Sequence, residues 1–303
     1  MKKQLSLLTL AALVASPVFA EPTLYGKANV SLQHADDGNE STLELVSNAS
    51  RLGVKGAQKV EDSGIEVFYQ AEFQVHMDDG EDKSGETFSQ RNIFVGVRGD
   101  FGAVQAGKFD TPLKVAQKKI DLFNDLEGDI KAVVTNSDNR ENDIVQYTTP
   151  AFGAVKVKVA LIASEDEDVD NGLSSSITYE QDGWYLAGAY DSSVEAENTD
   201  VIRLVAQYSF DAFQFGALYE MEDADGEDSR DAALISAKYK MNKWAFKAQY
   251  GSSDIKEEGG STFSIGADYK LAKSIKYFGY LTQNESDEGA DDSFIGIGLE
   301  YKF

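Results

Sequence analysis

The sequence predicts an all-β chain that closes into a transmembrane antiparallel β-barrel of sixteen strands. Three observations indicate this fold class. Runs of roughly ten residues alternate apolar and polar side chains, and runs of this length cross a bilayer at a tilt. The connections between the runs alternate between short turns and long acidic loops. One long insertion, residues 111–139, interrupts the pattern.

The first twenty residues have the features of a secretory signal peptide. Lys2 and Lys3 form a basic start, an apolar run follows over 5–14, and Ala20 ends a small-residue cleavage pattern. The apolar run is shorter than the roughly 18 residues that a membrane-spanning helix needs. We therefore expect residues 1–20 to be removed on export and residues 21–303 to form a single barrel domain.

Strict alternation is clearest over 65–77, where apolar residues occupy the odd positions from Ile65 to Met77 and polar residues occupy most of the even ones. The pattern recurs over 213–221, 244–250, 263–271 and 295–303. It places one face of each strand on an apolar medium and the other on a polar one. A soluble β-sandwich also alternates, but an open sheet of this size would leave unpaired edges, which favours a closed barrel.

The segment 87–99 departs from this alternation. Arg91 shares its parity with Ile93 and Val95, whereas Phe88 and Phe94 fall on the other face. Either a β-bulge shifts the parity within this strand, or both of its faces pack against protein.

Composition excludes several classes of function. The chain has 52 acidic and 28 basic residues, a net charge of −24, which argues against nucleic acid as a partner. It has no cysteine, and His34 and His76 are its only histidines, so thiolate or histidine-rich metal sites and histidine-based catalysis have little to draw on. We expect no enzymatic activity, no cofactor and no metal centre, although acidic outer loops that bind divalent cations between anionic lipid headgroups stay an open alternative.

The insertion 111–139 is predicted to begin with a short helix. Thr111 and Pro112 suit an N-cap and the first helical position, and Leu113, Ala116 and Ile120 recur at helical spacing. Long insertions of this kind are usually functional or disordered. The charged residues that we assign to a functional loop are Lys114, Lys118, Asp121, Asp125, Glu127 and Asp129.

Several basic residues fall on the polar face of their strands. Arg51 and Lys55 oppose Leu52, Lys108 opposes Phe109, and Arg140 shares its parity with polar neighbours. A lipid-facing Arg or Lys at mid-depth would cost ~2–4 kcal/mol. We therefore expect Arg51, Lys55, Lys108 and Arg140 to project into the barrel lumen, with Arg91 as a further member.

Taken in order, several motifs resemble the general diffusion porins of the Gram-negative outer membrane. They are Leu24-Tyr-Gly-Lys-Ala28, Ser50-Arg-Leu-Gly-Val-Lys-Gly56, Arg91-Asn-Ile-Phe-Val-Gly96, the run 101–112, Arg140-Glu-Asn142, the run 147–153 and Tyr301-Lys-Phe303. Each motif alone is weak, and their common order gives the resemblance its specificity.

The resemblance implies a water-filled channel for passive diffusion of small hydrophilic solutes and ions. Its third outer loop, residues 111–139 here, would fold inward and narrow the pore. Positions matching Arg51, Arg91 and Arg140 line the basic side of that constriction in the family, which often has arginine where this chain has Lys108. The resemblance further implies a homotrimer, contact with outer-membrane lipid including lipopolysaccharide, and insertion by the barrel assembly machinery, with Tyr301 and Phe303 as the assembly signal.

Two alternatives remain open. The concentration of wall cations is also compatible with an anion- or substrate-specific outer-membrane channel. A barrel with a structural or adhesive role, acting through its acidic loops, belongs to a different class. The sign of any ion selectivity is open too, because the acidic mouths favour cations and the wall arginines favour anions.

Overall fold

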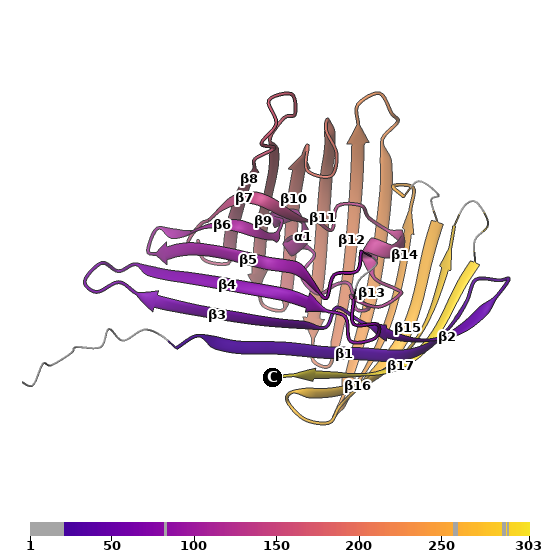
Figure 1. Cartoon of the computed structure of the whole chain (residues 1–303). Coiled ribbons are helices and arrows are strands. Elements are labelled where there is room, and N and C mark those ends of the chain that lie inside the picture. The colour runs from indigo at the N-terminus through magenta and orange to yellow at the C-terminus, as the bar shows by residue number, and fades with distance from the viewer. Residues whose placement is uncertain (1–20, 82–83, 257–259, 287–288, 290) are drawn as a thin grey trace, which may run out of the picture.

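The computed structural model describes residues 21–81, 84–256, 260–286, 289 and 291–303 (Figure 1). In these residues seventeen strands form one antiparallel sheet, and β1 (Thr23–Asp36) pairs with β17 (Asp291–Lys302), which closes the sheet into a barrel. The expected signal peptide, residues 1–20, lies outside the described residues. The other strands are β2 (Ser41–Ser47), β3 (Arg51–Lys59), β4 (Glu66–Val75), β5 (Phe88–Gly99), β6 (Gly102–Asp110), β7 (Arg140–Thr148), β8 (Val155–Ile162), β9 (Gly172–Gln181), β10 (Trp184–Ser192), β11 (Thr199–Phe210), β12 (Phe213–Ala224), β13 (Arg230–Met241), β14 (Trp244–Ser253), β15 (Gly260–Lys270) and β16 (Ile275–Glu285).

The second membrane crossing is divided into β2 and β3. Both strands pair with β1, β2 along its second half and β3 along its first half. The break falls at 48–50, where Ala49 has a φ of 48° and Ser50 exchanges hydrogen bonds with the backbone of Asn29. Counting β2 and β3 as one crossing gives sixteen, so the predicted fold class is confirmed.

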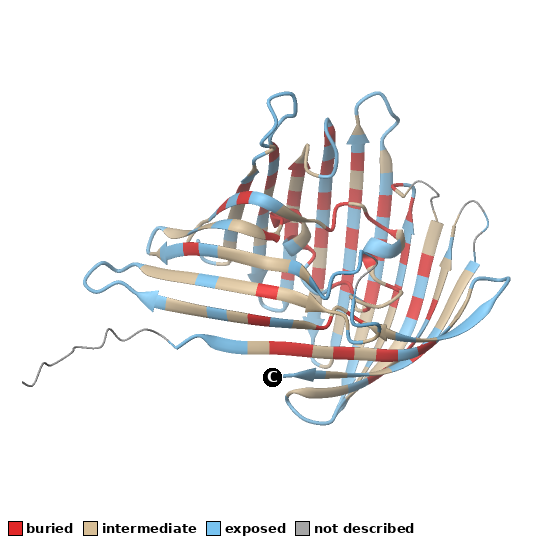
Figure 2. Ribbon diagram, viewed as in Figure 1, coloured by how far each residue is buried: buried red, intermediate tan, exposed pale blue. Residues whose placement is uncertain are grey.

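Buried and exposed residues alternate along many of the strands (Figure 2), and their polarity is the reverse of that in a soluble protein. In β11, for example, Ile202 and Leu204 are exposed on the outside, whereas Arg203 and Gln207 are buried inside. An outer surface of exposed apolar and aromatic side chains suits a hydrocarbon environment. None of the helices in the described residues has the length and hydropathy required to cross a membrane.

Two irregularities lie side by side in the wall. Between β4 and β5 the register shifts so that Arg91 and Asn92 together oppose Glu72. Between β6 and β7 a second shift places two residues of β7, 142 and 143, opposite Lys108. The first shift explains the parity conflict in 87–99, since an extra residue moves the following side chains to the other face. Of the two interpretations of that segment, the bulge is correct.

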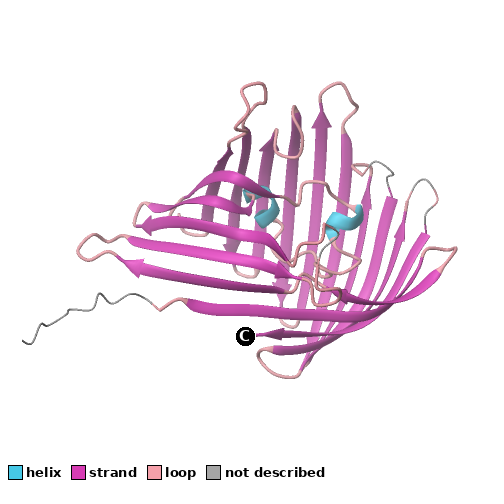
Figure 3. Cartoon of the chain, in the orientation of Figure 1, coloured by secondary structure: helices cyan, strands magenta, loops and turns pink. Residues whose placement is uncertain are grey.

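The insertion between β6 and β7 lies within the ring of strands and carries both helices, α1 (Pro112–Ala116) and α2 (Ile130–Val133), as Figure 3 shows. We call residues 111–139 the inner loop. Thr111 Oγ1 accepts a hydrogen bond from Lys114 N at 3.2 Å, and Pro112 holds the first helical position, as expected from the sequence. The helix is shorter than the spacing up to Ile120 suggested, because Lys118 has a φ of 53°, which ends the helical path.

Candidate functional site

One side of the inner loop is fixed to the barrel wall by an apolar cluster. Leu113, Ile120, Ile130 and Val134 have 0% exposure and pack mainly against side chains of strands β10–β13. Burial of such side chains contributes roughly 1.5–3 kcal/mol each. The wall residues of this cluster are Tyr185, Ala187, Ala189, Val201, Val205, Leu218, Ala232, Leu234 and, beyond the end of β14, Ile255.

A buried ion pair reinforces this attachment. Arg203 of β11 and Glu220 of β12 are register partners with 0% side-chain exposure, and Arg203 Nε lies 2.5 Å from Glu220 Oε2. Arg203 Nη2 also donates to Thr135 Oγ1 at 3.0 Å, and the Thr135 hydroxyl in turn donates to Glu220. Because every member has a partner, the network binds the C-terminal part of the loop to the wall.

Asp121 and Asp129 both stabilise the loop through hydrogen bonds within it. Asp121 is 7% exposed and accepts from Phe123 N and Ile130 N at 3.0 Å each, and from Gln249 Nε2 at 3.1 Å. Burial and the nearby Asp129 carboxylate raise the pKa of Asp121 against the opposing effect of these donors. Burial also raises the pKa of Asp129, which caps α2 by accepting from Lys131 N. The sequence predicts both acids on the loop side of the constriction. Asp121 turns toward the loop backbone, whereas Asp129 shapes the loop and also lines the cavity between the loop and the wall.

Asp125 and Glu127 reach from the tip of the loop to the wall. Asp125 Oδ2 lies 2.7 Å from Lys27 Nζ and 3.5 Å from Arg51 Nη2. Glu127 Oε1 accepts from Gln33 Nε2 at 2.8 Å. Asp125 is therefore the loop carboxylate that meets the predicted basic wall, and Glu127 fastens the tip beside β1.

The wall arginines sit at the two bulges and are each paired. Arg91 Nε lies 2.9 Å from Glu72 Oε1, and Arg140 Nη2 lies 2.9 Å from Asp110 Oδ1. Arg140 Nε also donates to Asn92 Oδ1 at 2.8 Å, so the extra residue of the first bulge orients the next arginine. The side chains of Arg51, Arg91 and Arg140 are 12–24% exposed, so their charges are accessible to the lumen.

A cavity of about 750 Å³ separates the loop from these strands, and we call it the eyelet cavity. Wall residues Arg51, Arg91, Lys108 and Arg140 line it. From the loop come Lys114, Lys118, Lys119, Lys131, Asp125, Asp129 and Asp138. Its lining holds eight basic and five acidic residues, so the passage is predominantly positive. Lys114 is tied to Asp110 and Asp138 at 3.4 and 3.2 Å, and Lys118 to Glu180 at 2.5 Å.

One predicted wall cation lies outside the eyelet cavity, and the two residues assigned to the assembly signal lie at the end of the last strand. Lys55 stacks over the Tyr25 ring at 4.8 Å, on the turn side of the eyelet cavity, and is not part of its lining. Tyr301 and Phe303 lie at the barrel closure, where Phe303 exchanges backbone hydrogen bonds with Gly26. A Cβ at position 26 would come within 2.3 Å of the Phe303 ring, which explains the glycine there.

Sequence reasoning missed the acids that pair with the wall arginines and the pair that anchors the loop. Glu72 follows the polar parity of its strand, so its lumenal position was readable. The lumenal position of Asp110 could not be predicted in this way, because Asp110 lies at the end of β6, next to the second bulge. Arg203 and Glu220 also lie on polar faces, but their partnership depends on strand register.

Comparison with known proteins identifies relatives of this chain that agree on one family. A family model described as Gram-negative porin matches residues 7–289. The major outer membrane protein P.IB of Neisseria meningitidis serogroup B is 24% identical over 340 residues, covering 100% of both chains, and that of Neisseria sicca is 23% identical over 363 residues with the same coverage.

Solved structures share the fold. An anion-selective porin from Comamonas acidovorans superposes with a TM-score of 0.74 at 19% identity, covering 94% of this chain and 100% of that one. The Salmonella typhi OmpF complex with daunomycin also gives 0.74, at 15% identity, covering 94% and 98%. Because the family model spans most of the sequence, the chain belongs to the Gram-negative porins, outer-membrane channels rather than enzymes.

Proposed function

We propose that the chain is a general diffusion porin whose selectivity is set in the eyelet cavity, between Arg51, Arg91, Lys108 and Arg140 on the wall and Asp125 on the loop. The observation that carries this proposal is the excess of basic over acidic residues around a cavity of about 750 Å³. Charged rims select permeating ions by size and sign. We expect small hydrophilic solutes to pass, with a mild preference for anions.

The physical basis is field focusing. The chain as a whole is strongly acidic, with a net charge of −24. Charges at distant outer loops are screened within about 8–10 Å of solution at ordinary salt, whereas charges around a narrow passage act on every ion that crosses it. The local excess of cations in the eyelet cavity therefore outweighs the global charge.

Partners belong to the same proposal. The outer surface exposes many apolar and aromatic side chains, which suits contact with outer-membrane lipid, including lipopolysaccharide. We propose a homotrimer inserted by the barrel assembly machinery, with the strand that ends on Tyr301 and Phe303 as its recognition element. A solute-specific channel would differ from this proposal by conducting one anion and excluding other small solutes.

Planar-bilayer recording tests the proposal. The purified protein should give stepwise currents, grouped in threes if the trimer holds, and a reversal potential under a KCl gradient that indicates mild anion preference. Arg51→Ala with Arg140→Ala should shift that potential toward cations without abolishing the steps. Silence at every voltage would refute a channel, and an unchanged reversal potential would remove both arginines from the filter. Arg98→Ala, a change of an exposed arginine near a turn, is the matched control.

A further inference from the structure

A second group of cations lines the lumen on the wall opposite the arginines. It comprises Lys119 of the inner loop and six lysines of β13–β17, and we call it the lysine cluster. Along these strands Tyr239, Phe246 and Tyr277 are exposed on the outside, so the neighbouring lysines, whose side chains alternate with these rings, point inward. The six strand lysines are Lys238, Lys240, Lys247, Lys270, Lys276 and Lys302.

The arrangement of these lysines is electrostatically unfavourable for the empty barrel. Lys238 and Lys247 are direct register partners on β13 and β14, and Lys270 and Lys276 are direct partners on β15 and β16. Like charges directly opposite one another destabilise a sheet. Lys119 and Lys240 add to the repulsion felt by Lys238. Two such pairs at one end of one wall call for a compensating negative charge.

The carboxylates of this region compensate only part of the cluster. Asp268 lies 3.1 Å from Lys247 and 3.5 Å from Lys276, and Glu300 lies 2.9 Å from Lys302. Within the described residues no ion pair reaches the side chains of Lys119, Lys238, Lys240 or Lys270. Asp125 and Asp121, the other acids nearby, are engaged with Lys27 and with the loop backbone. A net positive charge is left over.

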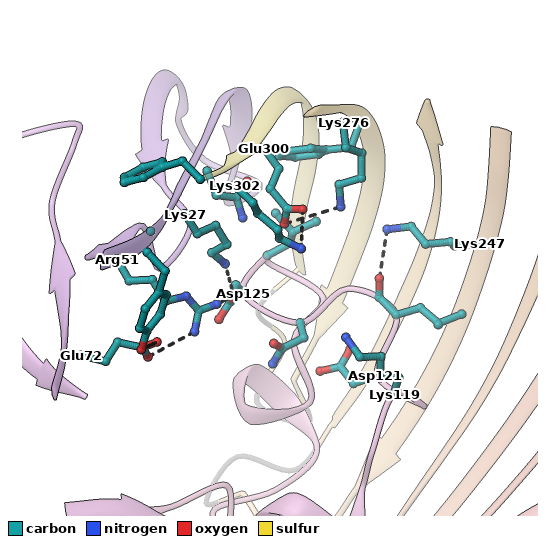
Figure 4. A pocket seen from close by; sticks show the side chains of 18 residues that line it. Lys27, Arg51, Glu72, Lys119, Asp121, Asp125, Lys247, Lys276, Glu300 and Lys302 are labelled. Carbon is teal, nitrogen blue, oxygen red and sulfur yellow. Dashed lines mark hydrogen bonds and ion pairs between the residues drawn. The ribbon is translucent and has the colours of Figure 1, made fainter. Parts of the chain in front are cut away.

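Space for an anion lies beside the other lysines of the cluster, and Lys238 adjoins that space through its register partner Lys247. A cavity of about 460 Å³ on the turn side of the inner loop is lined by Lys119, Lys247, Lys276 and Lys302 (Figure 4). A second cavity of about 430 Å³ near the turns shares Lys276, Glu300 and Lys302 with it and adds Lys240 and Lys270. Lys119 and Asp125 also line the eyelet cavity, so the three spaces follow one another through the barrel.

We propose that the lysine cluster is a binding site for small, multiply charged oxyanions on the periplasmic side of the inner loop. Short turns mark the periplasmic end of outer-membrane barrels. Lysine ammonium groups bind such anions as point charges with several donors, and a dianion compensates two facing lysines at once. This site rests on the proposed channel function. Anions that have passed the eyelet cavity would bind there before they leave the barrel.

Current block by inorganic pyrophosphate tests the site. In KCl, wild-type channels should lose open-channel current saturably as pyrophosphate is added at constant ionic strength, whereas equimolar nitrate should leave the current unchanged. Lys238→Gln with Lys240→Gln should raise the half-blocking concentration about tenfold, which corresponds to 1.4 kcal/mol. The matched control is Lys59→Gln with Lys156→Gln, two lysines at the same end of the opposite wall, which should block as wild type does.

The chain has no cysteine, which permits a charge-rescue experiment. A Lys238→Cys, Lys240→Gln channel should block weakly, and modification with a cationic aminoethyl thiol reagent should restore block, whereas an anionic sulfonate reagent should not. Variants with wild-type step sizes in KCl alone have folded. Absence of any current would contradict the proposed channel, whereas normal current without saturable block, or equal loss of block in the matched control, would overturn the lysine site alone.

Discussion

The two halves of the barrel interior treat the inner loop in opposite ways. Strands β10–β13 meet it with buried apolar side chains and with Arg203 and Glu220, both at 0% exposure. Strands β3–β7 face it across a cavity of about 750 Å³ with Arg51, Arg91 and Arg140, which remain partly exposed. One half holds the loop, and the other half leaves room beside it.

The difference teaches how a long polar insertion acquires a fixed position inside a channel. The ion pairs of Asp125 with Lys27 and Arg51 connect the loop tip to the other wall, but they leave the eyelet cavity open beside them. The apolar and buried contacts on the other side supply the attachment. Selectivity and anchoring are thereby separated onto different walls and can be changed independently.

The largest effect should come from breaking the buried pair. Glu220→Leu leaves Arg203 and Thr135 without their carboxylate, and removal of one partner of a buried ion pair typically costs about 3–5 kcal/mol. We expect earlier thermal unfolding in detergent and noisier open-channel current.

The double variant Arg203→Met with Glu220→Leu tests the origin of that loss. It should recover much of the stability, because no charge is left buried without a partner. Arg98→Ala, which removes an exposed pair with Glu66, should change the unfolding temperature little. A Glu220→Leu channel as stable and quiet as wild type would show that the loop does not depend on this half.

Helix α1 offers a second comparison within five residues. Leu113 is fully buried against the anchoring wall, whereas Val115 is 42% exposed. Leu113→Ala should lower the free energy of unfolding by about 2–5 kcal/mol, while Val115→Ala should change it by less than about 1 kcal/mol. Chemical unfolding followed by tryptophan fluorescence measures both, and equal losses would contradict the assignment of the two halves.

The sequence was sufficient for the barrel because alternation is a local property of each strand. Arg51, Arg91, Lys108 and Arg140, which the sequence pattern predicts in the lumen, all line one cavity. The sequence alone could not show which acid of the inner loop contacts the wall. Which of them meets the wall depends on backbone turns with positive φ at Lys118 and Asp125, which send Asp121 inward and Asp125 across.

The contact between Arg203 and Glu220, which anchors the loop, could not be predicted from the sequence for a related reason. Arg203 and Glu220 belong to neighbouring strands, and their contact follows from a register that turn geometry and packing determine together. The lysine pairs of β13–β16 depend on register in the same way. Long-range partners of this kind leave no periodic signal in the chain.

The smallest expected effect is a dependence on pH that arises in the anchoring half. Burial raises the pKa of Asp121 in the folded loop, so the folded state binds this proton more tightly than the unfolded chain does. Stability from this group is therefore complete below the ordinary carboxyl range near pH 4 and is lost as pH rises through the raised value. Current noise from loop motion should increase, and the unfolding temperature should fall, between pH 5 and pH 9.

Asp121→Asn should flatten that dependence, because the amide carries no titrating proton and still accepts one of the backbone hydrogen bonds. Glu167→Gln, a change of an exposed carboxylate in an outer loop, should leave the slope with pH as in wild type. If Asp121→Asn keeps the wild-type slope, the titrating group lies elsewhere. If stability rises with pH instead, the three N–H donors around Asp121 outweigh its burial, and the loop is held by an ionised carboxylate.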